Sequence, residues 1–268
     1  MTPAGLHVRT YRQGEPGHLP VVLLHGFPFD SRMWDDVAAR VTVRGAVLAV
    51  DLPGLGGSPL ATGTEPSLER SADLVAAALA ARGVVRAAVV GLSMGGYVAL
   101  ALLERHPDLV AALGLLDTTS AADQDGPRAN RLRIAGEVEA SGTVEVVRPM
   151  VHAVLGASSV RSRPELAVRL GRLVDEQAPA GVAWSQRAMA GRPDRTAALR
   201  AFAGPALVLV GDGDEVTPLA AAERMRSALT GAELVVVPRS GHMSAVEQPA
   251  AVALAVDDLL RRAPTARR

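Results

Sequence analysis

Six short apolar runs, each bounded by turn residues, restrict the fold of this chain more than any other feature. They are PVVLLHG (20–26), GAVLAVDLPG (45–54), RAAVVGLS (86–93), VAALGLLDTT (110–119), PALVLVGDGD (205–214) and AELVVVPRSG (232–241). Continuous Val, Leu and Ala runs without polar alternation are typical of strands buried on both faces, as in a parallel sheet covered by helices. Helical patterns over 67–82 and 94–105 lie between some of the runs. The alternation predicts an α/β fold with a doubly wound, mostly parallel sheet.

The strand-like runs stop between Thr118 and Arg200, where the sequence becomes rich in arginine and in helical patterns. Pro164 and Pro179 stand where each could open a helix, and Pro149 indicates a kink or a break. We expect a helical insertion that covers the sheet as a cap. This interpretation divides the chain into a first core segment, a cap and a second core segment at residues 1–117, 118–202 and 203–268.

Composition and charge exclude several functional classes. The chain is 49% hydrophobic and 21% charged, which favours a globular protein with a large core over a disordered one. Its formal net charge is zero and only 3% of its residues are aromatic, so it lacks the basic and stacking surface of a nucleic-acid binder. It has no cysteine, and every basic residue is arginine, which excludes disulfides, thiolate catalysis and lysine-dependent chemistry.

The first 18 residues lack the basic-then-apolar pattern of a secretory signal. No later stretch approaches the roughly 18 uninterrupted apolar residues of a membrane span. We therefore expect a cytoplasmic protein with no membrane segment and no nucleic-acid partner. Nothing in the sequence indicates an oligomeric state.

The stretch VVGLSMGGYVAL (89–100) places Ser93 between a strand-like run and a helical run, with Gly91 and Gly95 two positions away on either side. In a G-x-S-x-G nucleophile elbow the strand turns sharply into a helix, the corner residue is strained, and the glycines give it clearance. The turn would expose the Ser93 hydroxyl at the carboxyl edge of the sheet. It would also place the backbone N–H of Met94 at a helix N-terminus, where it can stabilise negative charge. A tight turn without chemistry is the alternative for this pattern alone.

A serine nucleophile needs a general base, and six histidines are candidates. Four of them are better explained as structural or solvated: His7, His18, His106 and His152. The first two lie in a polar N-terminal segment that we interpret as hairpin-like. His25 precedes Ser93, which is the wrong order for this fold, and we expect it to shape its own loop. His242, in SGHMSAVEQP, follows the last predicted strand and would overhang the same sheet edge as Ser93. We assign His242 as the base.

Asp214, in VGDGDEVTP at the end of a strand, is the preferred partner of that base, and Asp117 at the end of an earlier strand is the rival. The order Ser93, Asp214, His242 matches the Ser-Asp-His order of a nucleophile-elbow hydrolase. All three would lie at the carboxyl ends of strands. The segment DGDEV loosely resembles a calcium loop, but the glycine and the closing glutamate of that motif are misplaced, so we expect no metal.

Two backbone amides could stabilise the oxyanion of a tetrahedral intermediate. LLHGFPFDSRMW turns at His25-Gly26, so the N–H of Phe27 would face the same point as the N–H of Met94. Each such donor lowers the barrier by on the order of 3 kcal/mol. The apolar side chains that we predict to line a substrate pocket, with ordinary core packing as the alternative, are Phe29, Met150, Trp184, Met189 and Met243. Trp34 we assign to the core.

Five motifs in order, LLHGFPFDSRMW, AVDLPGLGGS, GLSMGGYVAL, GDGDEVTP and SGHMSAVEQP, resemble the successive signatures of the α/β-hydrolase fold superfamily. The resemblance is to its serine-nucleophile branch, which holds small esterases, 3-oxoadipate enol-lactonase-like proteins and cofactor-free perhydrolases. It implies a nucleophile at Ser93, a base at His242, an acid at Asp214, an oxyanion hole at Phe27 and Met94, and no cofactor. It also implies that the helical insertion is the family's cap. Relatives that cleave carbon-halogen bonds or epoxides have aspartate at the elbow, so the serine excludes that chemistry.

The sequence thus predicts a serine hydrolase that cleaves a small-molecule carboxylic ester or lactone through an acyl-enzyme. Carbon-carbon bond hydrolysis on the same triad is the alternative, although Phe-Pro-Phe stands where those enzymes often have a glycine-rich oxyanion loop. A ligand-binding protein without catalysis is a second alternative, and the presence of every triad member argues against it.

Overall fold

The computed structural model describes residues 5–60, 63 and 65–263, and within them seven strands form one sheet in the order β1-β3-β2-β4-β5-β6-β7. The strands are β1 (Val8–Arg12), β2 (Val21–Leu24), β3 (Val47–Val50), β4 (Ala87–Leu92), β5 (Val110–Leu116), β6 (Ala206–Gly211) and β7 (Glu233–Val237). The pairs from β3 to β7 are parallel, and β1 pairs antiparallel with β3. Each of the six apolar runs contains one strand, so the predicted mostly parallel sheet is confirmed.

The N-terminal segment, which we interpreted as hairpin-like, instead adds β1 to the edge of the sheet beside β3. Its sequence VRTYR is mostly polar, and only Val8 is buried. An edge strand with one solvated face has this pattern, whereas the apolar-run criterion selects strands buried on both faces. The criterion therefore missed this strand.

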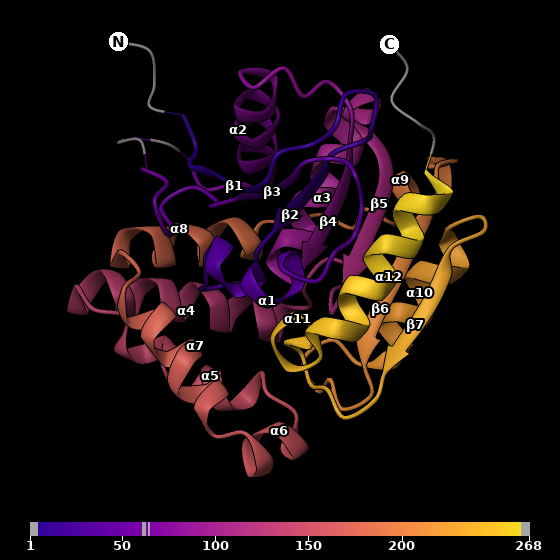
Figure 1. Ribbon diagram of the computed structural model, residues 1–268. Helices are drawn as coiled ribbons and strands as arrows, with labels where there is room; N and C mark the ends of the chain where they lie inside the picture. The colour runs from indigo at the N-terminus through magenta and orange to yellow at the C-terminus, as the bar shows by residue number, and fades with distance from the viewer. Residues whose placement is uncertain (1–4, 61–62, 64, 264–268) are drawn as a thin grey trace.

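Helices cover both faces of the sheet (Figure 1). The helices of the core are α1 (Asp35–Ala38), α2 (Leu68–Ala80), α3 (Met94–Arg105), α10 (Leu219–Ala228), α11 (Ser244–Glu247) and α12 (Pro249–Arg262), with 3-10 turns η1 (Ser31–Trp34) and η2 (Pro107–Leu109). Across the sheet, the step from β2 to β3 goes toward the β1 edge, whereas the steps from β4 through β5 and β6 to β7 go toward the opposite edge. Right-handed crossovers therefore put α1 and α3 on opposite faces. Helix α12 packs on α1, and α2 packs on α3.

The segment between β5 and β6, which we predict to form the cap, is built of helices. It comprises α4 (Asp125–Ser141), η3 (Glu145–Val147), α5 (Met150–Ala153), α6 (Ala157–Ser162), α7 (Glu165–Asp175) and α8 (Pro179–Ala190). Pro164 precedes α7 and Pro179 is the first residue of α8, and the break at Pro149 separates η3 from α5. The next helix, α9 (Thr196–Ala201), packs on α3 and α10 of the core. Figure 1 shows α4 to α8 gathered at one end of the sheet.

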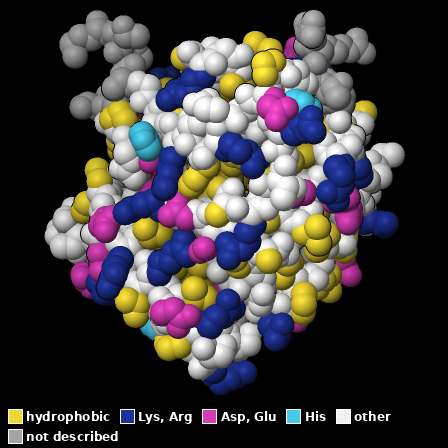
Figure 2. Space-filling view, viewed as in Figure 1, with side chains coloured by type: hydrophobic (Ala, Val, Ile, Leu, Met, Phe, Trp, Pro, Cys, Tyr) yellow, Lys and Arg dark blue, Asp and Glu magenta, His cyan; other side chains and the backbone are white. Residues whose placement is uncertain are grey.

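The core is formed by the side chains of the sheet and of its two helical layers. Trp34 and Phe29 are fully buried there, so the assignment of Trp34 to the core is confirmed. On the surface, Figure 2 shows arginine side chains interspersed with acidic ones over the face in view. In the part of the chain that the structure describes, no helix has the length and apolar character needed to cross a bilayer.

Candidate active site

Ser93 lies at the sharp turn between β4 and α3, with φ of 52° and ψ of −114°. This positive φ is rare for a residue with a side chain and places Ser93 in a strained corner. A Cβ atom on Gly91 would lie 2.2 Å from the carbonyl oxygen of Gly95, and a Cβ atom on Gly95 would lie 2.1 Å from that of Leu24. The two glycines thus let the first turn of α3 lie against β4 and the end of β2, whereas the elbow interpretation placed the avoided clash at Ser93 itself.

The side chains of Ser93, His242 and Asp214 form a continuous chain of hydrogen bonds. Ser93 Oγ lies 2.8 Å from His242 Nε2. On the other side of the ring, Nδ1 lies 2.9 Å from Asp214 Oδ2 and 3.1 Å from Oδ1. With the proton on Nδ1 donated to the carboxylate, Nε2 is free to accept the serine proton. His242 and Asp214 are buried and Ser93 is half-buried, which leaves the reactive oxygen accessible.

Asp214 is held in place by hydrogen bonds from the residues that follow it in the chain. The N–H groups of Val216 and Thr217 donate to Oδ1 at 2.8 and 2.9 Å, and the Thr217 hydroxyl donates to Oδ2 at 2.8 Å. Burial alone would raise the pKa of Asp214, but hydrogen bonding and charge from His242, together with the Thr217 bonds, hold that pKa below its usual range. The carboxylate is therefore ionised at neutral pH and can orient the ring.

Asp117, the rival acid, makes its hydrogen bonds elsewhere. Its Oδ1 accepts the N–H of Gly211, and its Oδ2 accepts both the N–H and the hydroxyl of Ser244. The structure therefore brings Asp214 rather than Asp117 to the ring of His242.

The proposed oxyanion donors lie on the two loops that meet at the elbow. Met94 is the first residue of α3, and a first-turn N–H has no acceptor within its own helix. Phe27 follows β2 in a tight loop that is closed by the N–H of Phe29 donating to the carbonyl of Gly26 at 3.0 Å. The assignment of these two amides to an oxyanion hole remains a prediction.

His25 holds the Phe27 loop in place, as we expected. Its Nε2 accepts the N–H of Leu52 at 2.9 Å, and its Nδ1 donates to the carbonyl of Gly26 at 3.0 Å. Burial lowers the pKa of His25, so the ring is neutral and a single tautomer satisfies both bonds. The role of His25 is to connect the loop after β2 to the loop after β3.

The predicted pocket residues come from three parts of the chain. Phe29 lies after β2, Met150 begins α5, Trp184 and Met189 are in α8, and Met243 follows the base. All are buried except Met150, which is half-buried. Their assignment to the pocket remains a prediction.

The cap directly supports the loop of the base, which the sequence did not reveal. The backbone N–H of His242 donates to the carbonyl of Val154 in the cap at 2.9 Å. The fully buried carboxylate of Glu247 accepts the N–H of Gly156 from the cap at 2.9 Å and that of Gly241 at 2.8 Å. Glu247 stands in the same motif as His242, but a lone glutamate in a predicted helix is more often solvated, so the pattern gave no signal.

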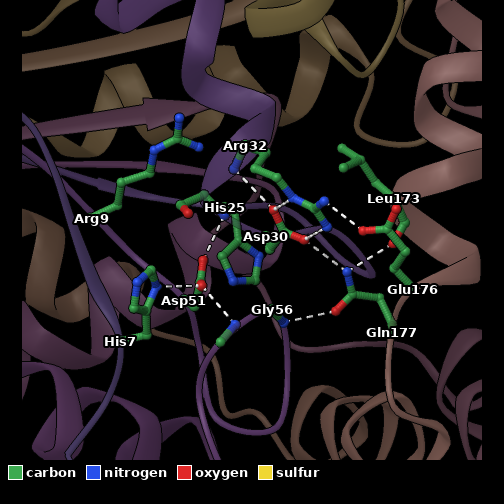
Figure 3. Close-up of polar contacts among 12 residues, drawn as sticks. His7, Arg9, His25, Asp30, Arg32, Asp51, Gly56, Leu173, Glu176 and Gln177 are labelled. Carbon is green, nitrogen blue, oxygen red and sulfur yellow. Dashed lines mark hydrogen bonds and ion pairs between the residues drawn. The ribbon is translucent and has the colours of Figure 1, made fainter.

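A second polar cluster joins the other end of the cap to the core (Figure 3). Gln177, which follows α7, donates to Asp30 Oδ2 at 2.9 Å and accepts the N–H of Gly56 at 2.9 Å. Arg32 pairs with Asp30 at 2.7 Å and with Glu176 at 2.5 Å. Burial alone would raise the pKa of Asp30, but the bonds from Arg32 keep it below its usual range. The buried Asp30 thus remains charged and anchors the cap.

Asp51 continues this cluster on the core side. Its Oδ1 accepts the N–H of Ser31 at 2.7 Å, and its Oδ2 accepts the N–H of Gly57 at 2.9 Å. His7 Nδ1 lies 2.8 Å from the same Oδ2, as Figure 3 shows. These bonds tie the loop after β3 to the loop after β2 and to the residue preceding β1.

Comparison with known proteins gives consistent matches over almost the whole chain. A family model described as alpha/beta hydrolase fold matches residues 20–249. A pimeloyl-[acyl-carrier protein] methyl ester esterase of Chromobacterium violaceum is 32% identical over 248 residues, covering 88% of this chain and 91% of that protein. A 2-succinyl-6-hydroxy-2,4-cyclohexadiene-1-carboxylate synthase of Enterobacter sp. is 31% identical over 260 residues, covering 93% and 95%. Among solved structures, a thermophilic esterase from Thermogutta terrifontis is 34% identical with a TM-score of 0.90, covering 97% of this chain and 95% of that one.

Proposed function

The chain belongs to the alpha/beta hydrolase fold family, and on that premise we propose that it hydrolyses a carboxylic ester or lactone through an acyl-enzyme on Ser93. The observation that carries the proposal is the hydrogen-bonded chain from Ser93 through His242 to Asp214 at a strained elbow. The esterases among its relatives support the same class of reaction.

In the first half-reaction, His242 Nε2 takes the proton of the Ser93 hydroxyl as Oγ attacks the carbonyl carbon of the substrate. The tetrahedral oxyanion that forms accepts hydrogen bonds from the N–H groups of Phe27 and Met94. Asp214 stabilises the protonated ring without taking its proton. The ring then gives the proton to the departing alkoxide, and an alcohol leaves.

In the second half-reaction, His242 takes a proton from water, and the resulting hydroxide attacks the acyl carbon bound to Ser93. A second oxyanion forms at the same two amides. Its collapse releases the carboxylic acid, and the proton returns from His242 to Ser93 Oγ. In a lactone the alcohol and the acid remain parts of one product molecule. The cycle needs only water as co-substrate.

We propose a small-molecule substrate whose acyl or alcohol part contacts apolar side chains from the core and the cap. The candidate contacts are Phe29, Met150, Trp184, Met189 and Met243, which are apolar apart from the indole N–H. Methionine side chains adapt to irregular shapes, so a pocket that contains three of them suits a flexible acyl group.

A fluorophosphonate probe tests the nucleophile directly. We expect the intact protein to gain one adduct on Ser93 and the Ser93→Ala variant to gain none and to lose at least about 10³-fold in ester turnover. Ser71→Ala, at a buried serine in α2, is the matched control and should label normally. Absence of an adduct on the wild-type protein, or equal labelling of Ser93→Ala, would refute the proposal. Rapid cleavage of a dione with negligible ester turnover would favour carbon-carbon bond hydrolysis instead.

A further inference from the structure

Asp117 is a fully buried carboxylate next to the triad for which the mechanism above has no use. It directly follows β5 and has a φ of 45°, which is uncommon for a residue other than glycine. Its backbone N–H donates to the carbonyl of Leu209 in β6 at 2.9 Å. Asp117 is therefore held in a strained conformation at the carboxyl edge of the sheet. The loops that carry the triad leave the sheet at the same edge.

The Asp117 side chain connects the loops that carry the acid and the base. Its Oδ1 accepts the N–H of Gly211 at 3.0 Å, and Gly211 ends β6 three positions before Asp214. Its Oδ2 accepts the N–H of Ser244 at 3.1 Å and the Ser244 hydroxyl at 2.5 Å, and Ser244 follows His242 by two positions. All three contacting groups, two from Ser244 and one from Gly211, are donors, which an ionised carboxylate satisfies and a protonated or amide group satisfies only in part.

The residue after Asp117 extends this connection to the nucleophile. The hydroxyl of Thr118 donates to the carbonyl oxygen of Ser93 at 2.8 Å. Two consecutive residues thus contact the backbone of all three segments that carry the triad. A structural role confined to one loop would not require this convergence.

We propose that Asp117 is a positioning residue whose carboxylate fixes the loops of Asp214 and His242 relative to each other and supplies negative charge behind the base. The inference rests on the proposed function and deepens it. Asp117 contacts neither the ring of His242 nor the reacting atoms, so it acts through the backbone and through its charge.

The charged groups around Asp117 are consistent with this role. Burial is the largest influence and raises its pKa, the charge of His242 lowers it, and the charge of Asp214 raises it, with a net value of about 7. The hydrogen bonds from Ser244 and Gly211 also act to lower it. By reciprocity, an ionised Asp117 favours the protonated ring of His242 that forms in the first half-reaction.

Asp117→Asn is the discriminating variant because it keeps the volume and removes the charge and one acceptor. We expect kcat on a model ester to fall by about 10- to 100-fold with KM changed by less than about 2-fold. Because the Asp117 carboxyl loses its proton only near pH 7, the deficit of the variant in kcat should grow as the pH rises through about 7. Ser244→Ala should lower kcat in the same direction but by less, since its N–H donor remains.

Near-ultraviolet circular dichroism establishes that each variant is folded, and the fluorophosphonate labelling rate reports the nucleophile separately from turnover. A folded Asp117→Asn variant with wild-type kcat on both sides of pH 7 would overturn the inference. If that variant fails to fold, wild-type kinetics of Ser244→Ala would overturn it. Failure of the wild-type protein to label at Ser93 would instead refute the proposed function, so the two failures are distinguishable.

Discussion

Replacing Asp117 with Asn should remove a specific pH dependence from the free energy of unfolding. Burial raises the pKa of this carboxyl from 3.8 to about 7 in the folded protein. Between these two values the folded chain binds a proton that the unfolded chain has released. The corresponding stabilisation is therefore complete below the unfolded pKa and is lost as the pH rises through about 7.

The magnitude follows from the two pKa values. Each pKa unit corresponds to about 1.4 kcal/mol, so the rise from 3.8 to about 7 gives a loss of about 4 kcal/mol over the whole transition. About 3 kcal/mol of this loss in the free energy of unfolding should occur between roughly pH 4.5 and pH 7.5. Urea unfolding at several pH values in this window measures the loss as the difference in free energy of unfolding between the wild-type protein and Asp117→Asn.

Taking the difference removes the contribution of other groups. His25, for example, has a pKa lowered by burial, so its contribution to stability grows as the pH rises, and it is present in both proteins. Asp108→Asn, at an exposed carboxylate in η2, is the matched control. A wild-type minus Asp117→Asn difference that stays constant within about 0.5 kcal/mol, or that increases with pH, would refute the reasoning.

Substitutions at the triad, the elbow and the cap contact give three separate tests. Asp214→Asn should lower kcat by about 10⁴-fold and leave the circular dichroism spectrum unchanged, because the amide favours the wrong tautomer of the base. Gly95→Ala should lower the free energy of unfolding in urea by more than about 2 kcal/mol, because its Cβ would lie 2.1 Å from the carbonyl oxygen of Leu24. Gln177→Ala should cost about 1–3 kcal/mol in the same assay, because the buried carboxylate of Asp30 and the N–H of Gly56 both lose a partner.

Each of these tests has a result that would contradict it. Near-normal turnover of Asp214→Asn would move the acid to Asp117. Wild-type stability of Gly95→Ala would mean that the first turn of α3 is not confined by β2. For the cap contact the control is Glu176→Ala, whose exposed ion pair should contribute less than about 1 kcal/mol. An equal effect of the two cap variants would argue against the buried contact.

The sequence alone was sufficient for the six parallel strands, for the sharp turn at Ser93 and for the three residue types that the fold brings together there. Apolar runs without alternation identify strands buried on both faces because every side chain in such a strand must be apolar. Glycines two positions from Ser93 indicate the elbow because a Cβ atom on Gly91 would clash with the backbone of Gly95, four positions along the chain. These features depend on residues close together in the chain, so a pattern records them.

Only the tertiary structure showed that Asp214 is hydrogen-bonded to His242 and that Asp117 is hydrogen-bonded to Gly211 and Ser244 instead. Asp117 and Asp214 both follow buried strands, and their different partners depend on how β5 and β6 lie beside the loop of His242. The contact of Gln177 with Asp30 joins residues separated by 147 positions. Such contacts depend on how segments far apart in the chain pack together, which a local sequence pattern does not predict. The sequence therefore determined the local conformations and the residue types for the chemistry, whereas packing determined their partners.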